Sequence, residues 1–131
     1  MRKNNRITGN CPCNSGKNYK ECCKPYHKGK DPKTALILMR ARYSAYIKGR
    51  DSFIEDTWHP STRPENIDFD SDIKWTSLEI QDTKLGTESD DTGFVTFYIR
   101  FIKDGFPGAM TEISEFIKES DRWYYLKGII K

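Results

Sequence analysis

The spacing of apolar residues changes from helical to alternating near position 73. Between positions 36 and 46, apolar and aromatic residues recur every three or four positions, which predicts a helix. Asp31 and Pro32 favour the start of this helix, because Asp is a good cap and Pro suits a first helical position. A shorter helix follows, since Ser52 and Glu55 have the spacing of a capping box.

The second half of the chain has the composition of β-strands separated by short turns. Consecutive strands with short turns favour an antiparallel meander. Helices followed by strands indicate an α+β domain, with the helices packed on one face of a curved sheet. The second strand has large apolar side chains on both faces, so we expect both to be covered. The four predicted strands cover residues 73–84, 94–103, 110–118 and 123–130.

The 131 residues suffice for one domain and a small appendage. We divide the chain into a basic tail with a cysteine knuckle (1–24), a linker (25–30) and an α+β body (31–131). The term knuckle refers below to residues 10–24. Because the body has its own apolar residues, this division predicts that metal removal unfolds the knuckle alone.

All four cysteines lie within thirteen residues, in the pattern C-x-C-x8-C-C. Disulfides in such a short segment would staple only a small loop, so a reducing compartment and a bound metal fit better. Zinc prefers four soft ligands at the corners of a tetrahedron. Unligated or redox-active thiols are the alternative, and His27 is an alternative fourth ligand. The predicted zinc ligands are Cys11, Cys13, Cys22 and Cys23.

Charge is concentrated at the start of the chain. Residues 1–30 hold eight Lys or Arg and one acidic residue, which gives +7 against −4 for the remainder. Four thiolates and one zinc ion would leave +5 at the front. Such a basic surface attracts acidic proteins, RNA or anionic surfaces, although a solubilising terminus explains it equally well. The predicted partner-binding residues are Lys17, Lys20 and Lys24.

The segment from Cys11 to Cys23 resembles a SEC-C motif. This motif is similar to the zinc-binding C-terminal tail of the bacterial translocase motor SecA, whose knuckle contacts a chaperone and the ribosome. The Gly that usually follows the second Cys is Asn14 in this chain, and Asn also tolerates a left-handed turn. The closing ligand of the motif corresponds to Cys23.

The resemblance extends over most of the chain, which is similar to the YchJ family. That family resembles the nuclear transport factor 2-like superfamily, in which a curved sheet wraps around helices to form a cone. The resemblance therefore implies a fold and a metal but no reaction, because no biochemical function is established for the family. The matching segments are residues 25–27, 38–46, 57–64 and 122–125.

The cone of this superfamily often holds a pocket. Most of the candidate lining residues suit an ordinary core equally well. His59 can instead cap a helix, and Arg63 can instead form a buried ion pair. An isomerase-like or dehydratase-like enzyme would use Glu112 with His59 as its general base. The possible pocket residues are Tyr43, Trp58, His59, Arg63, Trp75, Tyr98 and Glu112.

No motif requires an enzyme, and whether the chain is one stays open. We expect an adaptor whose basic knuckle binds a partner protein such as a chaperone or the ribosome. A small-molecule-binding protein or enzyme with a pocket in the cone is the alternative, and nucleic-acid binding is a third possibility. We also expect a cytoplasmic location and no membrane insertion, since no secretion signal or long apolar run is visible.

Overall fold

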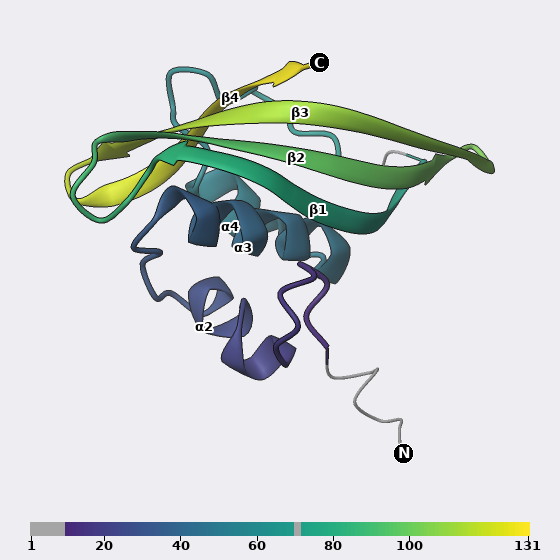
Figure 1. Ribbon diagram of the computed structural model, residues 1–131, viewed down its shortest axis with the longest axis horizontal. Coiled ribbons are helices and arrows are strands. Elements are labelled where there is room, and N and C mark those ends of the chain that lie inside the picture. The colour runs from purple at the N-terminus through teal and green to yellow at the C-terminus, as the bar shows by residue number, and fades with distance from the viewer. Residues whose placement is uncertain (1–9, 70–71) are drawn as a thin grey trace.

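The computed structural model describes residues 10–69 and 72–131, so the predicted tail, residues 1–9, lies outside the described residues. A short N-terminal segment is followed by two helices and a four-stranded sheet (Figure 1). The elements are η1 (Tyr19–Glu21), α2 (Lys24–His27), α3 (Ala35–Lys48), α4 (Asp51–Asp56), β1 (Ile73–Leu85), β2 (Thr92–Lys103), β3 (Phe106–Glu119) and β4 (Arg122–Ile130).

The long helix α3 begins later than the sequence pattern predicts. Thr34 has extended backbone angles, and its hydroxyl accepts a hydrogen bond from the Ile37 amide at 3.1 Å. This cap satisfies one of the free amide groups of the first turn, so the helix starts after Thr34 rather than at Asp31. The capping box predicted for α4 is absent, because Ser52 lies inside the helix and Arg50 makes no capping bond.

The sheet is an antiparallel meander with the strand order β1-β2-β3-β4, as the sequence predicts. Two-residue turns join β2 to β3 and β3 to β4. Asp104, Gly105, Ser120 and Asp121 all have positive φ angles, which match the right-handed twist of a tight hairpin. Because its first turn has only two residues, β3 begins four residues earlier than predicted. The pairing of β1 with β2 has two register shifts, between Trp75/Ser77 and Ile80/Asp82.

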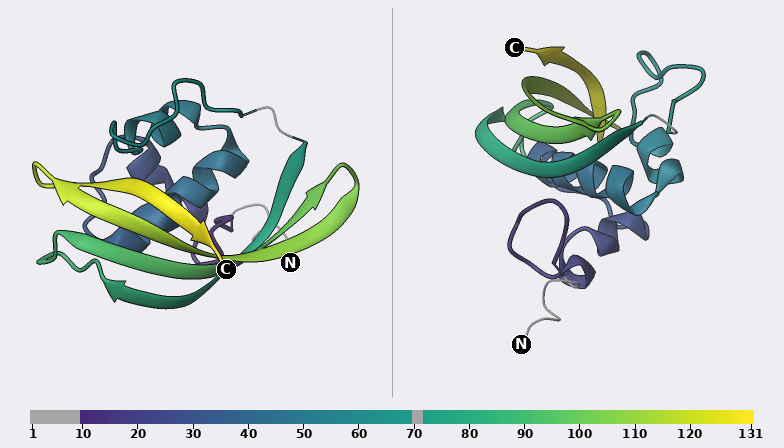
Figure 2. Two further views of the ribbon diagram at one scale, coloured as in Figure 1. Left: turned by 90° about the horizontal axis from the view of Figure 1, so that it is seen from above. Right: turned by 90° about the vertical axis from the view of Figure 1, so that its right-hand side faces the viewer.

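One face of the sheet packs against α3 (Figures 1 and 2). In β2, Val95, Phe97 and Ile99 are buried, whereas Phe94 and Tyr98 on the other face are only half-buried. The prediction that both faces of this strand are covered is therefore wrong. No other described segment lies over the outer face, so the large side chains there remain partly exposed.

A pair of glycines lets the start of α3 approach the sheet. The Ala35 amide donates to the carbonyl of Gly86 at 3.0 Å, and Gly86 has a φ of 80°. A Cβ atom at Gly93 would lie 2.5 Å from the Cα of Gly86 and 3.0 Å from the Cβ of Ala35. Such contacts are too short, so glycine is required for this close packing.

Helix α3 lies between the sheet and the N-terminal segment, which gives three layers (Figure 1). Part of the predicted linker is helical, because Pro25 occupies an early position of α2 and fixes a helical φ. Cys11, Cys13 and Cys23 belong to the same cluster of buried residues as Leu38 and Phe97. The knuckle is thus packed onto the body rather than suspended from it.

Candidate metal centre and neighbouring cavity

The knuckle folds back on itself through a left-handed turn after the second cysteine. Asn14 has a φ of 66° and Gly16 a φ of 86°, so both adopt the conformation expected of this turn. The Cys11 amide then donates to the carbonyl of Lys17 at 2.9 Å, which closes the loop. Asn18 caps η1 by accepting from the Lys20 amide, and η1 leads the chain directly into the second pair of cysteines.

The four cysteine sulfurs converge on one point. All of them lie within 4.8 Å of one another, and none forms a disulfide. The Sγ atom of Cys22 is 3.5 Å from that of Cys13 and 3.9 Å from that of Cys23. Around an ion with metal–sulfur bonds of about 2.3 Å, tetrahedral sulfurs are separated by about 3.8 Å. The spacing of the sulfurs is therefore compatible with a bound tetrahedral metal ion.

The electrostatics of the cluster depend on mutual hydrogen bonds and burial. Hydrogen bonds from Cys11 and Cys23 lower the pKa of the Cys13 thiol. Burial raises the pKa of Cys22 to about 11, and hydrogen bonding with Cys11 raises the pKa of Cys23. A cation among the sulfurs would favour the thiolate forms, because it stabilises their charge and displaces their protons.

Groups outside the knuckle orient the cysteines. The Ser44 hydroxyl of α3 donates to Cys23 Sγ at 3.2 Å and lies 3.2 Å from Cys11 Sγ. The guanidinium of Arg40 donates to the carbonyl of Cys13 at 2.7 Å. Hydroxyl and backbone contacts of this kind fix ligand orientation around metal ions. Neither contact was predicted from the sequence, because both depend on how α3 packs against the knuckle.

His27 does not belong to the sulfur cluster. Its Nε2 donates to the carbonyl of Ala41 at 2.8 Å, since a carbonyl can only accept. Its Nδ1 then accepts from the Tyr19 hydroxyl at 2.8 Å. Burial lowers the pKa of His27, which favours this neutral form. In the described structure both ring nitrogens are thus engaged, and His27 joins α2 to α3.

The predicted partner-binding lysines differ in exposure. Lys17 and Lys20 are exposed on the knuckle, and Lys24 is half-buried at the start of α2. Tyr19, which the sequence places among them, is covered: the Nζ atom of Lys48 lies 4.4 Å from the centre of its ring.

A cavity of about 180 Å³ lies between α3 and the sheet. Its walls include Met39, Trp75, Phe97, Ile99 and Met110, and are mostly apolar. Four of the predicted pocket residues, Tyr43, Trp58, Trp75 and Glu112, line it, whereas His59, Arg63 and Tyr98 do not. The cavity also holds Arg42, which is 5 % exposed and was not among the predicted pocket residues.

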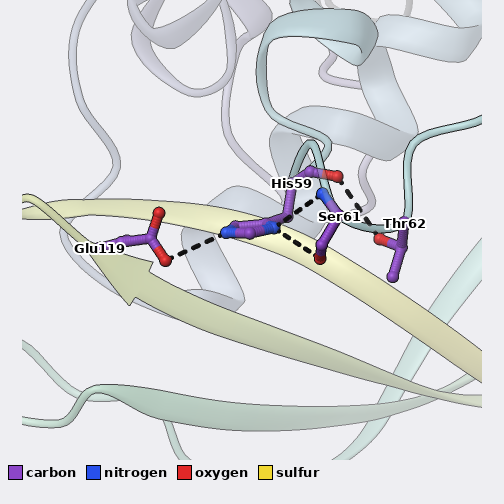
Figure 3. Close-up of polar contacts among 4 residues, drawn as sticks. All are labelled: His59, Ser61, Thr62 and Glu119. Atoms are coloured by element: carbon purple, nitrogen blue, oxygen red, sulfur yellow. Dashed lines mark hydrogen bonds and ion pairs between the residues drawn. The ribbon is translucent and has the colours of Figure 1, made fainter.

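His59 is half-buried and lies beside β3 and β4 (Figure 3). Its Nδ1 accepts from the Ser61 amide at 3.1 Å, and its Nε2 lies 3.1 Å from a carboxylate oxygen of Glu119. Glu112 instead accepts from the Ser114 hydroxyl at 2.9 Å. Within the described residues no hydrogen bond or ion pair joins His59 to Glu112, so the pair expected of an enzyme is not assembled.

Arg63 does not line the cavity but joins the loop that follows α4 to the end of that helix by a hydrogen bond. Its guanidinium donates to the carbonyl of Glu55 at 3.1 Å, at an exposed position. The His59 amide donates to the carbonyl of Tyr125, and the Thr62 hydroxyl donates to that of Leu126. These contacts fasten the loop to β4.

The fold and the cysteine cluster together define a class: a nuclear transport factor 2-like domain with an N-terminal SEC-C motif. The family model described as "YchJ, middle NTF2-like domain" matches residues 34–128, and the SEC-C motif matches residues 10–25. The chain belongs to the YchJ family. The resemblance drawn from the sequence is thereby confirmed. In the described residues, no helix has the length and apolar character needed to cross a membrane.

Relatives and solved structures agree with this assignment. A UPF0225 protein of Chromobacterium violaceum is 40 % identical, with 99 % of both chains covered. A UPF0225 protein of Streptomyces avermitilis is 39 % identical over 90 % of this chain and 82 % of the relative. The solution structure of a SEC-C motif containing protein from Rhodopseudomonas palustris matches with a TM-score of 0.80 and 30 % identity, covering 92 % of this chain and 97 % of that one.

Proposed function

We propose that the chain is a zinc-binding protein whose knuckle is a rigid module for binding a partner protein. One observation supports the metal: four cysteine sulfurs of the C-x-C-x8-C-C segment lie within 4.8 Å of one another. Zinc is the metal most often held by four cysteines, and a set of four thiolates leaves no open position for a substrate. The zinc is therefore structural.

The partner surface follows from the charge and rigidity of the knuckle. Lys17 and Lys20 are exposed in the knuckle, which Ser44, Arg40 and the metal would hold in one conformation. A rigid surface loses less conformational entropy on binding than a flexible tail does. Two exposed lysines, with Lys24 half-exposed beside them, favour an acidic protein surface.

Nucleic acid has less support than protein as the partner. Single-stranded nucleic acid binds where bases stack on exposed aromatic rings between basic residues. Tyr19 is the aromatic residue among the knuckle lysines, but Lys48 covers its ring and His27 binds its hydroxyl. Because of these two contacts, the charged surface of the knuckle has no exposed aromatic ring on which a base could stack.

Affinity capture from a lysate, with zinc content measured on the same preparation, tests the proposal. We expect about one zinc per chain, and a captured partner that is released as salt rises, because exposed charges are screened over about 8 Å at physiological ionic strength. Lys17→Glu with Lys20→Glu should reduce capture at least about tenfold while zinc stays bound.

Lys84→Glu with Lys103→Glu is the matched control, since it makes the same change in charge at exposed sheet positions. This control variant should capture the partner as the unchanged protein does. Metal-free protein with four reduced thiols would refute the zinc centre. Equal capture by both double variants would refute the knuckle as the partner surface.

A further inference from the structure

The cavity between α3 and the sheet contains a buried positive charge, that of Arg42, which interacts with Glu112 electrostatically but forms no hydrogen bond or ion pair with a described carboxylate. Arg42 is 5 % exposed, and none of the ion pairs in the described part of the chain includes it. Its Nη1 atom donates to the carbonyl of Ile54 at 3.0 Å and to the hydroxyl of Thr57 at 2.7 Å. A buried charge is costly unless it is paired.

The remaining donors of Arg42 have no acceptor among the described residues. Both of its hydrogen bonds use Nη1, which leaves the N–H groups of Nη2 and Nε free of such bonds. The rings of Trp58 and Tyr125 lie 5.2 Å and 4.5 Å from the guanidinium carbon. These aromatic faces stabilise the cation in part, but they accept no conventional hydrogen bond.

Two further polar groups of the same cavity are unsatisfied. The hydroxyl of Tyr43 and the indole N–H of Trp58 are buried and have no hydrogen-bond partner among the described residues. Tyr43 is 3 % exposed, and both side chains line the cavity. Buried polar groups nearly always have hydrogen-bond partners in folded proteins. Two buried donors without partners, next to the guanidinium of Arg42, therefore indicate a missing acceptor.

Glu112 is the acidic residue of the lining. Its carboxylate accepts from Ser114 and lies against β4, where a Cβ atom at Gly128 would come within 2.3 Å of it. Burial raises the pKa of Glu112, and the charge of Arg42 opposes this shift. The cavity therefore offers an excess of hydrogen-bond donors, and the guanidinium of Arg42 forms no ion pair with the carboxylate of Glu112 in the described residues.

We propose that this cavity binds a small organic acid with an apolar body, and that the carboxylate of this acid pairs with the guanidinium of Arg42. The apolar walls and the single cation fit a monoanion better than a phosphate, whose second charge would have no partner. A volume of about 180 Å³ suits one six-membered ring with its carboxylate, since a cavity of about 150 Å³ is known to hold benzene.

Two cavity methionines provide a direct readout. We would titrate the full-length, zinc-loaded protein, labelled with ¹³C at its methionine methyl groups, with sodium benzoate as the probe. The methyl resonances of Met39 and Met110, assigned with Met→Leu variants, should shift saturably with a dissociation constant of about 1 mM, ordinary for a ligand of this size. Benzyl alcohol, a neutral probe of similar size, should bind at least about tenfold more weakly, because it cannot pair with the guanidinium.

Variants then separate binding from folding. Arg42→Met should weaken benzoate binding roughly tenfold or more, since a hydrogen bond to a charged group is lost. Arg42 also donates hydrogen bonds to Ile54 and Thr57, so the Arg42→Met variant could fail to fold, and a second variant is needed. Tyr43→Phe removes a hydroxyl that has no hydrogen-bond partner. This variant should melt at the same temperature as the unchanged protein but bind benzoate about fivefold more weakly. Tyr98→Phe, outside the cavity lining, is the matched control and should bind benzoate unchanged.

Three results would overturn the proposal. The first is the absence of methionine shifts at 50-fold the expected dissociation constant, or about 50 mM benzoate. The second is equal affinity for benzoate and benzyl alcohol, which would indicate a merely apolar cavity. The third is unchanged benzoate affinity in a folded Arg42→Met protein or, if that variant does not fold, in Tyr43→Phe.

Discussion

Arg40 and Arg42 show how two similar side chains on one helix acquire different environments. They are two positions apart on α3 and therefore point in different directions around the helix axis. Arg40 reaches the backbone of Cys13, whereas Arg42 lies within the cavity, and burial lowers the pKa of Arg42 to about 10. At neutral pH Arg42 thus stays charged. The two arginines differ in their surroundings and not in their chemistry, and only Arg42 presents its charge to the cavity.

Glu112→Gln should raise the melting temperature at pH 8. Burial raises the pKa of Glu112 above 4.5, its ordinary value. The contribution of the carboxyl group to stability is therefore fully present below about pH 4.5 and is lost as pH rises through the folded-state pKa. Glutamine keeps the acceptor for Ser114 without the buried charge.

Thermal melts at pH 4.5 and pH 8 measure this effect, and Glu79→Gln at an exposed position of β1 is the control. The difference between Glu112→Gln and the unchanged protein should shrink toward pH 4.5. An equal difference at both values would show that ionisation of Glu112 has no part in it.

At the scale of elements, α3 is the helix on which the molecule is assembled. One side contacts the knuckle through Arg40 and Ser44, and the other faces the cavity and the sheet. Its limits follow from local chemistry, with the Thr34 hydroxyl at one end and a left-handed Gly49 at the other. A helix with both faces occupied shows no clean amphipathic pattern, which is why the sequence predicts its length better than its contacts.

Arg40→Met should loosen the knuckle from α3. The variant keeps the apolar stem but loses the 2.7 Å hydrogen bond to the carbonyl of Cys13, which should cost about 1–2 kcal/mol. Amide hydrogen exchange in the knuckle, read at the Cys11 amide, should accelerate roughly fivefold or more.

Arg122→Met serves as the control, because Arg122 forms a largely exposed ion pair with Asp31 at 3.5 Å. Exposed pairs contribute little, so knuckle exchange should be unchanged in this variant. Equal exchange in all three proteins would mean that Arg40 does not hold the knuckle.

At the scale of the whole molecule, the knuckle and the body share one core. Cys11, Cys13 and Cys23 pack in the same buried cluster as Leu38 of α3 and Phe97 of β2. The expectation that metal removal unfolds the knuckle alone therefore changes. If loss of a bound metal unfolds the knuckle, one side of α3 becomes exposed, and we expect the lost apolar burial to destabilise the sheet on the other side of α3 as well.

Chelation should lower the melting temperature of the sheet by roughly 10 °C or more, because each kcal/mol is worth about 3–6 °C in a domain of this size. Circular dichroism of the β-signal, with and without a chelator, measures the shift. Restoring one equivalent of zinc should reverse it. An unchanged melt of the sheet would show that knuckle and body are energetically separate.

The sequence predicts most of the fold but only part of the cavity, since four of the seven predicted pocket residues line it. Strand positions follow from alternation, so β1, β2 and β4 are predicted to within two residues at either end. The start of β3 is missed because turn length depends on the positive φ angles of Asp104 and Gly105. Arg42 is missed because an arginine on a helix is usually solvated, and only the packing of α4 and the sheet around it shows that it is buried.

The open sheet has two edges, and each has a feature that hinders pairing with another chain. The two register shifts in β1 disrupt a straight row of hydrogen-bonding groups, and charged residues such as Lys74, Glu79 and Asp82 are exposed along it. The loop after α4 occupies part of the β4 edge through its contacts with Tyr125 and Leu126. Free sheet edges are common starting points for aggregation. The bulges and the fastened loop thus help to keep neighbouring copies of this protein from joining strand to strand at high concentration.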